Sequence, residues 1–280
     1  MPAESVILVT GCSSGIGRAT VLEAAARGHR VFATARNRAD LVDLERRDRV
    51  EVLRLDVTEP DSIRQAIEAA LARTARLDGL VNNAGYGQYG AIEEVTPDEW
   101  RAQFEVNFFG TIAVTQAVLP AMRRARRGTI VNVSSVAGRV PIPFAAPYCA
   151  SKHALEAASD ALRVELWPFG IRVVLVEPGP IASRFGEHAR ALVAPFLSRP
   201  GPYREVYALA EKAMDGDFQR GQRPAEAVAR VVVEAIESPN PRPRYRIGPM
   251  ARVLIPLRRA LPDRWLDGMM RRALRLKRDA

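Results

Sequence analysis

Short runs of apolar residues alternate along the chain with longer segments in which apolar residues recur every three or four positions. The short runs predict strands at Val6–Val9, Arg30–Thr34, Val50–Leu55, Leu80–Asn82, Thr129–Val133, Arg172–Val176 and Tyr245–Ile247. The longer segments predict helices at Ile16–Arg27, Ser62–Arg73, Asp98–Arg126 (bent near Pro120), Tyr148–Trp167 and Ala225–Glu237. Short apolar strands separated by helices are typical of βαβ units.

This alternation predicts a single α/β domain with a Rossmann-like, doubly wound parallel sheet and helices on both faces. We expect the domain to cover residues 1–250. Residues of about 184–223 interrupt the alternation and contain three prolines. They indicate an insertion over the carboxyl edge of the sheet, where such folds bind ligands, or else a mobile surface loop. Residues 251–280 are expected to form a basic amphipathic extension.

The composition is that of an ordinary globular protein, with 280 residues of which 48% are hydrophobic and 26% charged. The two cysteines, Cys12 and Cys149, form neither a disulfide framework nor a metal-ligand spacing. No apolar stretch reaches the roughly 18 residues that suggest a spanning helix, and no secretion signal is recognisable at the N-terminus. We therefore expect a cytoplasmic protein without a metal site, with the membrane periphery as an alternative location.

The net charge of +9 suggests a nucleic-acid-binding protein at first, but its distribution argues against one. Residues 251–280 contain nine basic and three acidic residues, so this tail carries +6 of the total. The other 250 residues carry only +3, and they contain no recognised DNA-binding motif. We therefore expect no nucleic-acid partner.

The same tail has an apolar stripe at helical spacing, formed by Trp265, Leu266, Met269, Met270, Ala273 and Leu274. A stripe of this kind packs on its own domain or on a partner subunit, and this is the outcome that we expect. A basic amphipathic helix can also lie on an anionic membrane surface, which is the alternative.

A glycine-rich turn follows the first predicted strand and opens the first predicted helix. Its sequence is TGCSSGIG (Thr10–Gly17), with glycines at positions 11, 15 and 17. Glycines at such a place let the backbone turn tightly and approach a pyrophosphate at the helix N-terminus. The turn therefore predicts a dinucleotide-binding site.

Arg36 follows the second predicted strand, where a dinucleotide site selects its cofactor. An acidic residue there accepts a hydrogen bond from the ribose 2′-hydroxyl of NAD, whereas an arginine suits the 2′-phosphate of NADP. No Asp or Glu occupies positions 34–38, and Ser13 can add a hydroxyl contact. We expect NADP(H) to be preferred, with NAD(H) possible; the alternative is that Arg36 is a solvated loop charge.

Over about residues 5–250 the chain resembles the classical short-chain dehydrogenase/reductase family. The resemblance rests on motifs in the order and spacing of that family: the TGCSSGIG turn, Asp56, NNAG at 82–85, Asn107 in VNFFG, Ser135 in NVSSVAG, Tyr148 and Lys152 in YCASK, and Pro178-Gly179. Within the family, TGCSSGIG, ATAR and YCASK resemble the branch of 17β-hydroxysteroid and retinol dehydrogenases.

The resemblance implies a catalytic set of Asn107, Ser135, Tyr148 and Lys152. Tyr148 is expected to exchange a proton with the substrate oxygen, and Lys152 to lower the pKa of that phenol, since a nearby cation stabilises phenolate. Ser135 would hydrogen-bond the substrate oxygen, and Asn107 would hold a water linking Lys152 to bulk solvent. Ser134 is adjacent, but neighbouring strand residues face opposite ways, and family spacing selects Ser135.

The resemblance also implies a set of cofactor-binding residues. Lys152 would bind the nicotinamide ribose, and the Pro178-Gly179 turn with Ile181 would present backbone groups to the carboxamide. Ser183 stands where the family more often has Thr, and it keeps the hydroxyl. The full set is Gly11, Ser13, Ser14, Gly15, Ile16, Gly17, Arg36, Asp56, Asn83, Ala84, Gly85, Tyr148, Lys152, Pro178, Gly179, Ile181 and Ser183.

The substrate side is expected to come from the 139–147 loop and from the insertion. Their apolar residues predict a hydrophobic ketone, aldehyde or alcohol rather than a sugar or a small polar acid. The wall consists of Tyr86, Tyr89, Pro141, Ile142, Pro143, Phe144, Phe185, Phe196 and Leu197. His188, also in the insertion, is a candidate for contact with substrate.

The leading hypothesis is an NADP(H)-dependent oxidoreductase that interconverts a carbonyl and an alcohol on a hydrophobic substrate. NAD-dependent oxidation of a steroid- or retinol-like alcohol is a variant of it. A nucleotide-sensing regulatory protein of the same fold is a second hypothesis, which the intact catalytic set disfavours because a sensor needs no proton relay. We expect a homodimer or homotetramer.

Overall fold

The computed structural model describes residues 4–198, 201–215, 222–274 and 276. Within these residues, a sheet of seven strands has the order β3-β2-β1-β4-β5-β6-β9, and all its neighbouring strands are parallel. The strands are β1 Val6–Val9, β2 Arg30–Ala35, β3 Val50–Arg54, β4 Gly79–Asn82, β5 Gly128–Val133, β6 Ile171–Pro178 and β9 Arg244–Ile247. The doubly wound α/β fold predicted from the sequence is confirmed.

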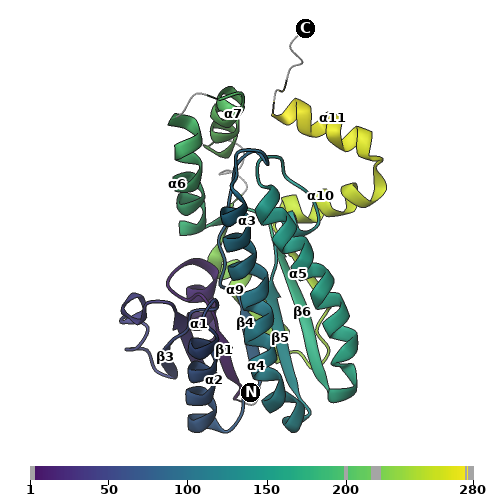
Figure 1. Ribbon diagram of the computed structural model, residues 1–280. Coiled ribbons are helices and arrows are strands. Elements are labelled where there is room, and N and C mark those ends of the chain that lie inside the picture. Colours follow the sequence, from purple (N-terminus) through teal and green to yellow (C-terminus); the bar gives the residue numbers. More distant parts are fainter. Residues whose placement is uncertain (1–3, 199–200, 216–221, 275, 277–280) are drawn as a thin grey trace.

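Helices cover both faces of the sheet (Figure 1). Helices α1 (Gly15–Ala26) and α9 (Ala225–Glu237) lie on one face, and α2 (Pro60–Thr74), α4 (Gly110–Ala125) and α5 (Ala146–Glu165) lie on the other. Strand β1 shows why its sequence is apolar throughout. Ile7 and Val9 belong to the core under α1 and α9, whereas Val6 and Leu8 belong to the opposite core, because successive strand residues face opposite ways.

The helix predicted over 98–126, with a bend near Pro120, is interrupted earlier in the structure. Helix α3 (Pro97–Phe104), which a Thr96–Glu99 capping box begins, is followed by a π-helical turn at Glu105–Phe109 before α4 continues to Ala125. The predicted bend was placed near Pro120, which lies inside α4. Such π-turns are frequent at functional sites, and this one contains Asn107.

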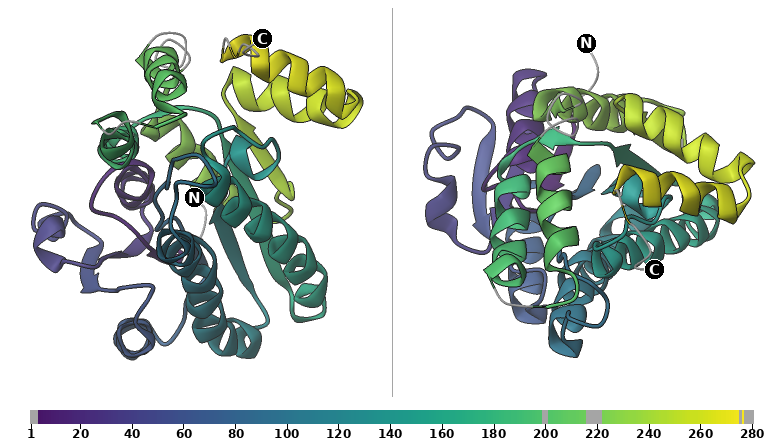
Figure 2. Two further views of the ribbon diagram at one scale, coloured as in Figure 1. Left: turned by 45° about the horizontal axis from the view of Figure 1, so that its top comes forward. Right: turned by 90° about the horizontal axis from the view of Figure 1, so that it is seen from above.

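The insertion and the tail are largely helical where the structure describes them. The insertion contains α6 (Arg184–Ser198) and α7 (Arg204–Asp215), flanked by the short paired strands β7 (Ile181–Ala182) and β8 (Arg223–Pro224). The tail forms α10 (Pro249–Ala260) and α11 (Asp263–Ala273). All four helices stand beyond the carboxyl ends of the strands, with α6 and α7 on one side and α10 and α11 on the other (Figures 1 and 2).

A boundary expected at residue 250 falls inside α10, which begins at Pro249. Helix α10 is attached to the body of the protein because Ala251 and Ile255 are buried against Val136 and Val140. The division into a domain of residues 1–250 and an extension of residues 251–280 therefore stays a prediction.

Candidate active site

The glycine-rich turn between β1 and α1 leaves no room for side chains. Gly11 and Gly15 have positive φ angles of 71° and 57°, which side-chain-bearing residues rarely adopt. A Cβ atom on Gly17 would lie 2.4 Å from the carbonyl oxygen of Gly11. The close approach of the backbone that the spacing predicted is therefore built into the structure.

A second segment, after β4, holds this turn in place. The Thr10 hydroxyl accepts hydrogen bonds from the main-chain N–H groups of Asn83 and Ala84, both at 3.0 Å. The Asn83 side-chain amide donates to the carbonyl oxygens of Thr10 and Gly11, also at 3.0 Å. Asn83 and Ala84, predicted as cofactor contacts, thus brace the turn, and sequence reasoning gave no role to the Thr10 hydroxyl.

The start of α1 is suited to an anion. Ser14 is the N-cap residue, and its side chain makes no capping hydrogen bond. The first turn of α1, which contains Ile16, has no acidic residue, so its N–H groups and the helix dipole favour a negative charge. Arg184 adds a cation nearby, because its guanidinium donates to the Ser13 carbonyl oxygen at 3.0 Å. These features fit a bound pyrophosphate.

Arg36 and Asp56 lie at the ends of neighbouring strands. Arg36 is exposed just after β2, and no carboxylate among the described residues lies within ion-pair distance of it, whereas nearby Arg38 pairs with Glu45. The Asp56 carboxylate accepts from the main-chain N–H and the hydroxyl of Thr58 at 2.9 and 2.8 Å. The guanidinium of Arg36 is therefore available to a phosphate.

The predicted cofactor-binding residues Pro178, Gly179, Ile181 and Ser183 lie at and just after the end of β6. The N–H of Gly179 donates to the Ile247 carbonyl oxygen at 2.9 Å, which ties the Pro178-Gly179 turn to the end of β9. Ile181 lies in β7. Ser183 meets the glycine-rich turn, since a Cβ on Gly15 would lie 3.2 Å from the Ser183 Cβ.

Helix α5 carries Tyr148 and Lys152 one turn apart, and both are buried, with 8% and 6% of their surface exposed. A hydrogen bond links Tyr148 to the Ser135 side chain. Ser135 follows β5 and also accepts from the Ala137 N–H at 3.1 Å. The adjacent Ser134 is buried near Gly138, and its hydroxyl has no hydrogen-bond partner among the described residues. The structure thus brings Ser135, rather than Ser134, to the tyrosine, and the catalytic role of Ser135 stays a prediction.

The pKa expected for Tyr148 needs a correction. Lys152 was expected to lower it, but burial raises the pKa of Tyr148 to about 12, with the Ser135 hydrogen bond acting in the opposite direction. Burial also lowers the pKa of Lys152 to about 8, against the attraction of Glu156. The physical reason is that desolvation penalises the charged form of both groups. In the protein alone, Tyr148 is a protonated donor at neutral pH.

Two groups that the sequence analysis did not single out interact with Lys152: the Val133 carbonyl oxygen and the Glu156 carboxylate. The Lys152 ammonium donates to the Val133 carbonyl oxygen at 2.8 Å. Glu156, one helical turn further along α5, is buried, and its carboxylate lies 3.2 Å from the Arg244 guanidinium. Burial raises the pKa of Glu156. The signal was present in the sequence, because Tyr148, Lys152 and Glu156 are spaced by four residues.

Asn107 is fixed by the backbone of Tyr86. Its side-chain oxygen accepts from the Tyr86 N–H at 3.0 Å, and its amide donates to the Tyr86 carbonyl oxygen at 2.9 Å and to the Ser151 hydroxyl at 3.3 Å. A Cβ on Gly85 would lie 3.0 Å from the same side-chain oxygen. Gln103, missed by sequence reasoning, donates to the same Tyr86 carbonyl at 2.9 Å. The water-binding role of Asn107 stays a prediction.

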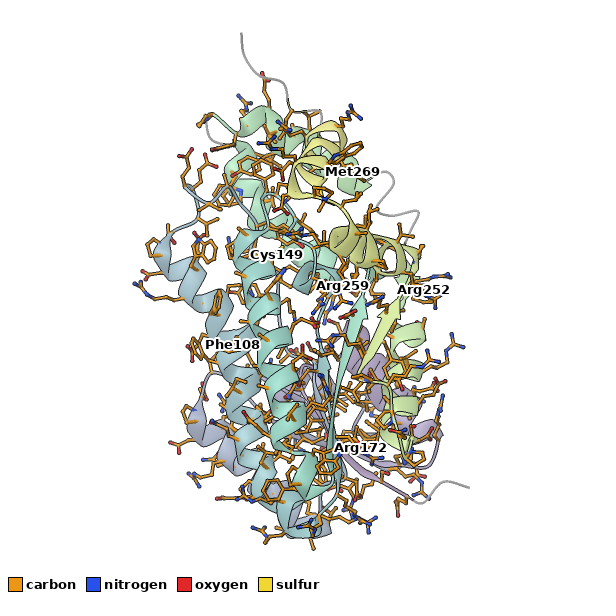
Figure 3. The ribbon with its side chains drawn as sticks, turned by 90° about the vertical axis from the view of Figure 1, so that its right-hand side faces the viewer. Phe108, Cys149, Arg172, Arg252, Arg259 and Met269 are labelled. Carbon is orange, nitrogen blue, oxygen red and sulfur yellow. The ribbon has the colours of Figure 1, made fainter. Side chains whose placement is uncertain are left out.

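Aromatic residues surround the tyrosine on the substrate side. The ring of Tyr89 is stacked on Tyr148 at a centroid distance of 6.3 Å, and Phe185 from α6 lies 5.5 Å away. Cys149, next to Tyr148, is labelled in Figure 3 on the end of α5 that faces the tail helices. Tyr89 and Phe185 were predicted as parts of an apolar wall, and the structure places them beside Tyr148.

A further aromatic cluster lies between the insertion and the segment before α3. Phe144 and Phe196, both predicted for the wall, contact Tyr207 at centroid distances of 5.6 and 5.5 Å. Tyr207 itself was missed; it is buried, accepts from the Ala91 N–H at 2.7 Å and donates to Glu94. The side chain of His188, a candidate for substrate contact, lies outside the described residues.

A parallel sheet that carries a glycine-lined anion site and a Ser–Tyr–Lys group at one edge defines a dinucleotide-dependent oxidoreductase. The profile of the short chain dehydrogenase family matches residues 5–192. The chain belongs to this family. It is an NAD(P)-dependent enzyme that acts on carbonyl and alcohol groups.

Relatives extend the similarity over almost the whole chain. The chain is 36% identical to a 3-ketodihydrosphingosine reductase of Bacteroides thetaiotaomicron over 97% of each protein. It is also 36% identical to an NADPH-dependent 3-dehydrocapnine reductase of Ornithobacterium rhinotracheale, over 93% of this chain and 94% of that protein.

Solved structures agree with this assignment. A short-chain dehydrogenase from Streptomyces avermitilis shares 33% identity with a TM-score of 0.78, covering 96% of this chain and 94% of the other. A short-chain dehydrogenase/reductase from Burkholderia phymatum, solved in complex with NAD, shares 26% identity with a TM-score of 0.80, covering 94% and 95% of the two chains. One of these similar proteins is thus named as NADPH-dependent, and another was solved in complex with NAD. In this protein, no helix among the described residues is both long and apolar enough to cross a membrane.

Proposed function

We propose that the protein is an NADPH-dependent reductase of a ketone carried on a long aliphatic chain. The observation that carries this proposal is the setting of Tyr148. Its phenol is protonated at neutral pH, is hydrogen-bonded to Ser135, and lies between the rings of Tyr89 and Phe185. A neutral phenol among apolar side chains is suited to give a proton to an apolar carbonyl compound.

The reduction follows from the positions of these groups. The Ser135 and Tyr148 hydroxyls would both hydrogen-bond the substrate oxygen and so orient and polarise its carbonyl group. The nicotinamide, when bound, supplies the hydride that the carbonyl carbon accepts. The Tyr148 O–H bond breaks as the substrate oxygen takes the proton, and the ammonium of Lys152 stabilises the resulting phenolate.

The preference for NADPH rests on Arg36. Its guanidinium is exposed at the end of β2 and is free of carboxylate partners among the described residues, so it can pair with a 2′-phosphate. An acidic residue in this place would repel that phosphate, and positions 34–38 contain none. NADH remains a weaker cofactor in this proposal, because the rest of the site does not depend on the 2′ group.

The substrate class is supported by the aromatic wall and by the names of the relatives. Both relatives are named as reductases of a 3-keto or 3-dehydro compound, and neither name refers to a steroid or a retinoid. Membership of the hydroxysteroid and retinol branch, which the motifs suggested, is therefore less well supported than membership of a group of aliphatic ketone reductases. An aliphatic ketone matches a wall built mostly from aromatic rings.

A substrate panel with both cofactors tests the proposal. Aliphatic ketones of increasing chain length, a steroid ketone and a small polar keto acid would each be offered with NADPH and with NADH. We expect kcat/KM to rise with chain length and to be highest with NADPH. Higher activity on the steroid or the keto acid would refute the substrate class, and equal kcat/KM with the two cofactors would refute the cofactor preference. The expected homodimer or homotetramer can be checked on the same preparation by light scattering.

A further inference from the structure

The two tail helices differ in how much of them is covered. Helix α10 is anchored, since Ala251 and Ile255 have 0% and 1% of their surface exposed. Helix α11 has no buried residue, and only Met270 reaches the cluster around α10. Of the stripe that was expected to pack on its own domain, only Met270 therefore contacts the cluster around α10.

The other side of α11 presents an apolar stripe to solvent. Trp265 is 69% exposed and Met269, one turn later, is 44% exposed. On α10, Val253 is 60% exposed. Figure 3 shows Met269 on α11 at the top of the molecule, away from the sheet. Tryptophan with an exposed ring is characteristic of surfaces that meet the interfacial layer of a membrane.

Unpaired arginines flank this stripe. Helices α10 and α11 contain six arginines, of which only Arg258 lies within ion-pair distance of a carboxylate among the described residues. Figure 3 shows Arg252 projecting outward from α10. Arg264, Arg271 and Arg272 on α11 are also unpaired, whereas Arg259 on α10 lines a hollow that also contains Glu156 and Asp160. The sequence adds Arg275, Lys277 and Arg278 after α11. The surface thus combines exposed apolar side chains with uncompensated positive charge.

We propose that this surface, formed by α10 and α11, docks on an anionic lipid bilayer. Guanidinium groups would pair with lipid headgroups while Trp265 and Met269 enter the interfacial layer. A second copy of the chain fits the surface less well, because a symmetric contact would place the same arginines against each other. The helices stand at the carboxyl end of the sheet, as the catalytic residues do, so docking would hold the site close to the membrane (Figures 1 and 2).

The docking surface is argued from α10 and α11 alone, so it can be tested without any substrate. The full-length protein would be sedimented with vesicles of pure phosphatidylcholine and with vesicles that also contain phosphatidylglycerol. We expect binding only to the anionic vesicles, and weaker binding as salt is raised, because salt screens exposed charges. Failure to bind the anionic vesicles, or equal binding to both kinds, would overturn the proposal.

Paired variants locate the surface. Trp265→Ala with Met269→Ala, and separately Arg271→Gln with Arg272→Gln, should each weaken vesicle binding at least tenfold. The matched controls are Trp167→Ala, which removes an 80% exposed ring in the 3-10 turn Trp167–Phe169 before β6, and Arg123→Gln with Arg124→Gln at the end of α4. These controls lie at the amino edge of the sheet and should bind like the unmodified protein. An equal loss in the controls would overturn the assignment.

Two further readouts separate this proposal from other outcomes. Light scattering should give the same oligomeric mass for the Trp265 and Met269 variant as for the unmodified protein; a smaller mass would show that the stripe joins two copies and would overturn membrane docking. Turnover of a short, water-soluble ketone by that variant should be unchanged. If the unmodified protein has no ketone reductase activity yet still binds vesicles, the proposed function fails and the docking surface stands.

Discussion

The cofactor side and the substrate side of this site are built by different means. On the cofactor side, the glycine-rich turn is tied by hydrogen bonds of 3.0 Å that Asn83 donates to Thr10, and a Cβ on Gly17 would meet a carbonyl oxygen at 2.4 Å. On the substrate side, the rings of Tyr89 and Phe185 lie 6.3 and 5.5 Å from the Tyr148 ring between centroids, and they belong to a loop and to the insertion.

Because of this difference, we expect the two sides of the site to differ in how well they tolerate amino-acid substitutions. Where two backbone segments are in close contact, as at Gly11 and Gly17, a larger side chain cannot be accommodated. The residues of the cofactor side therefore tolerate little substitution. Aromatic contacts are less directional, and rings of different size can fill the same wall. We therefore expect mutations on the cofactor and proton-transfer side to change rate or cofactor choice steeply, and those on the substrate side to change specificity mildly.

The largest effect is expected for Tyr148→Phe. The ring and its packing on Tyr89 remain, and only the transferable proton is lost. Loss of a general acid lowers the rate by about 10²–10⁴, so kcat/KM should fall by that factor while the Kd for NADPH stays nearly the same. Tyr245→Phe, which removes a hydroxyl that accepts a hydrogen bond from the exposed Arg242 N–H, is the control and should behave like the unmodified enzyme. Near-normal turnover by the Tyr148 variant would remove the tyrosine from the mechanism.

The second-largest effect is expected for Arg36→Asp, which should reverse the cofactor preference. A hydrogen bond to a charged group contributes about 1.5–3 kcal/mol, and each 1.4 kcal/mol is about tenfold in affinity. The unmodified enzyme should bind NADPH about ten- to a hundredfold more tightly than NADH, and the variant should reverse that order. Isothermal titration with both cofactors measures the four Kd values. Arg38→Gln, whose parent pairs with Glu45, should leave the preference unchanged.

The pH dependence of reduction gives a smaller effect and tests the electrostatics. Burial lowers the pKa of Lys152 to about 8, so its charge is present below that pH and is lost as the pH rises through it. The ammonium that stabilises the phenolate then disappears, and kcat/KM should fall by about tenfold per pH unit at the alkaline end. In Lys152→Arg the charge persists, so the alkaline fall should move to higher pH even if the overall rate is lower. An unshifted profile would exclude Lys152 as its cause.

The smallest effect is expected on the substrate side, for Tyr207→Phe. The change leaves the buried Ala91 N–H without its acceptor, which costs about 1–3 kcal/mol in the free energy of unfolding. KM for long-chain ketones should rise a few-fold, whereas kcat on a short ketone should hardly change. Tyr203→Phe is the matched control, because its hydroxyl bonds Glu93 at the surface. A loss of kcat as large as that of Tyr148→Phe would contradict the expectation that substitutions on the substrate side have mild effects.

The strands of the sheet and the chemical groups of the site could be predicted from local sequence patterns. Runs such as Val6–Val9 are apolar on every residue because both faces of a parallel strand are covered, and this pattern is visible without coordinates. The spacing of Tyr148 and Lys152 on one helix is equally local, since residues four apart share a helix face. The glycine-rich turn is also local, because positive φ angles at Gly11 and Gly15 require glycine.

Tertiary structure decided what depends on neighbours distant in sequence. The pKa of Tyr148 is raised rather than lowered because burial outweighs the hydrogen bond with Ser135, and burial is not a property of a motif. The break in the helix at Asn107 accompanies hydrogen bonds to Tyr86, and the anchor of the insertion is Tyr207 bonding Ala91. The stripe on α11 is visible in the sequence, but its exposure is a tertiary property, because only Met270 of the stripe packs on the cluster around α10. Local propensity fixes the elements, whereas solvation and long-range contacts fix what each side chain can do.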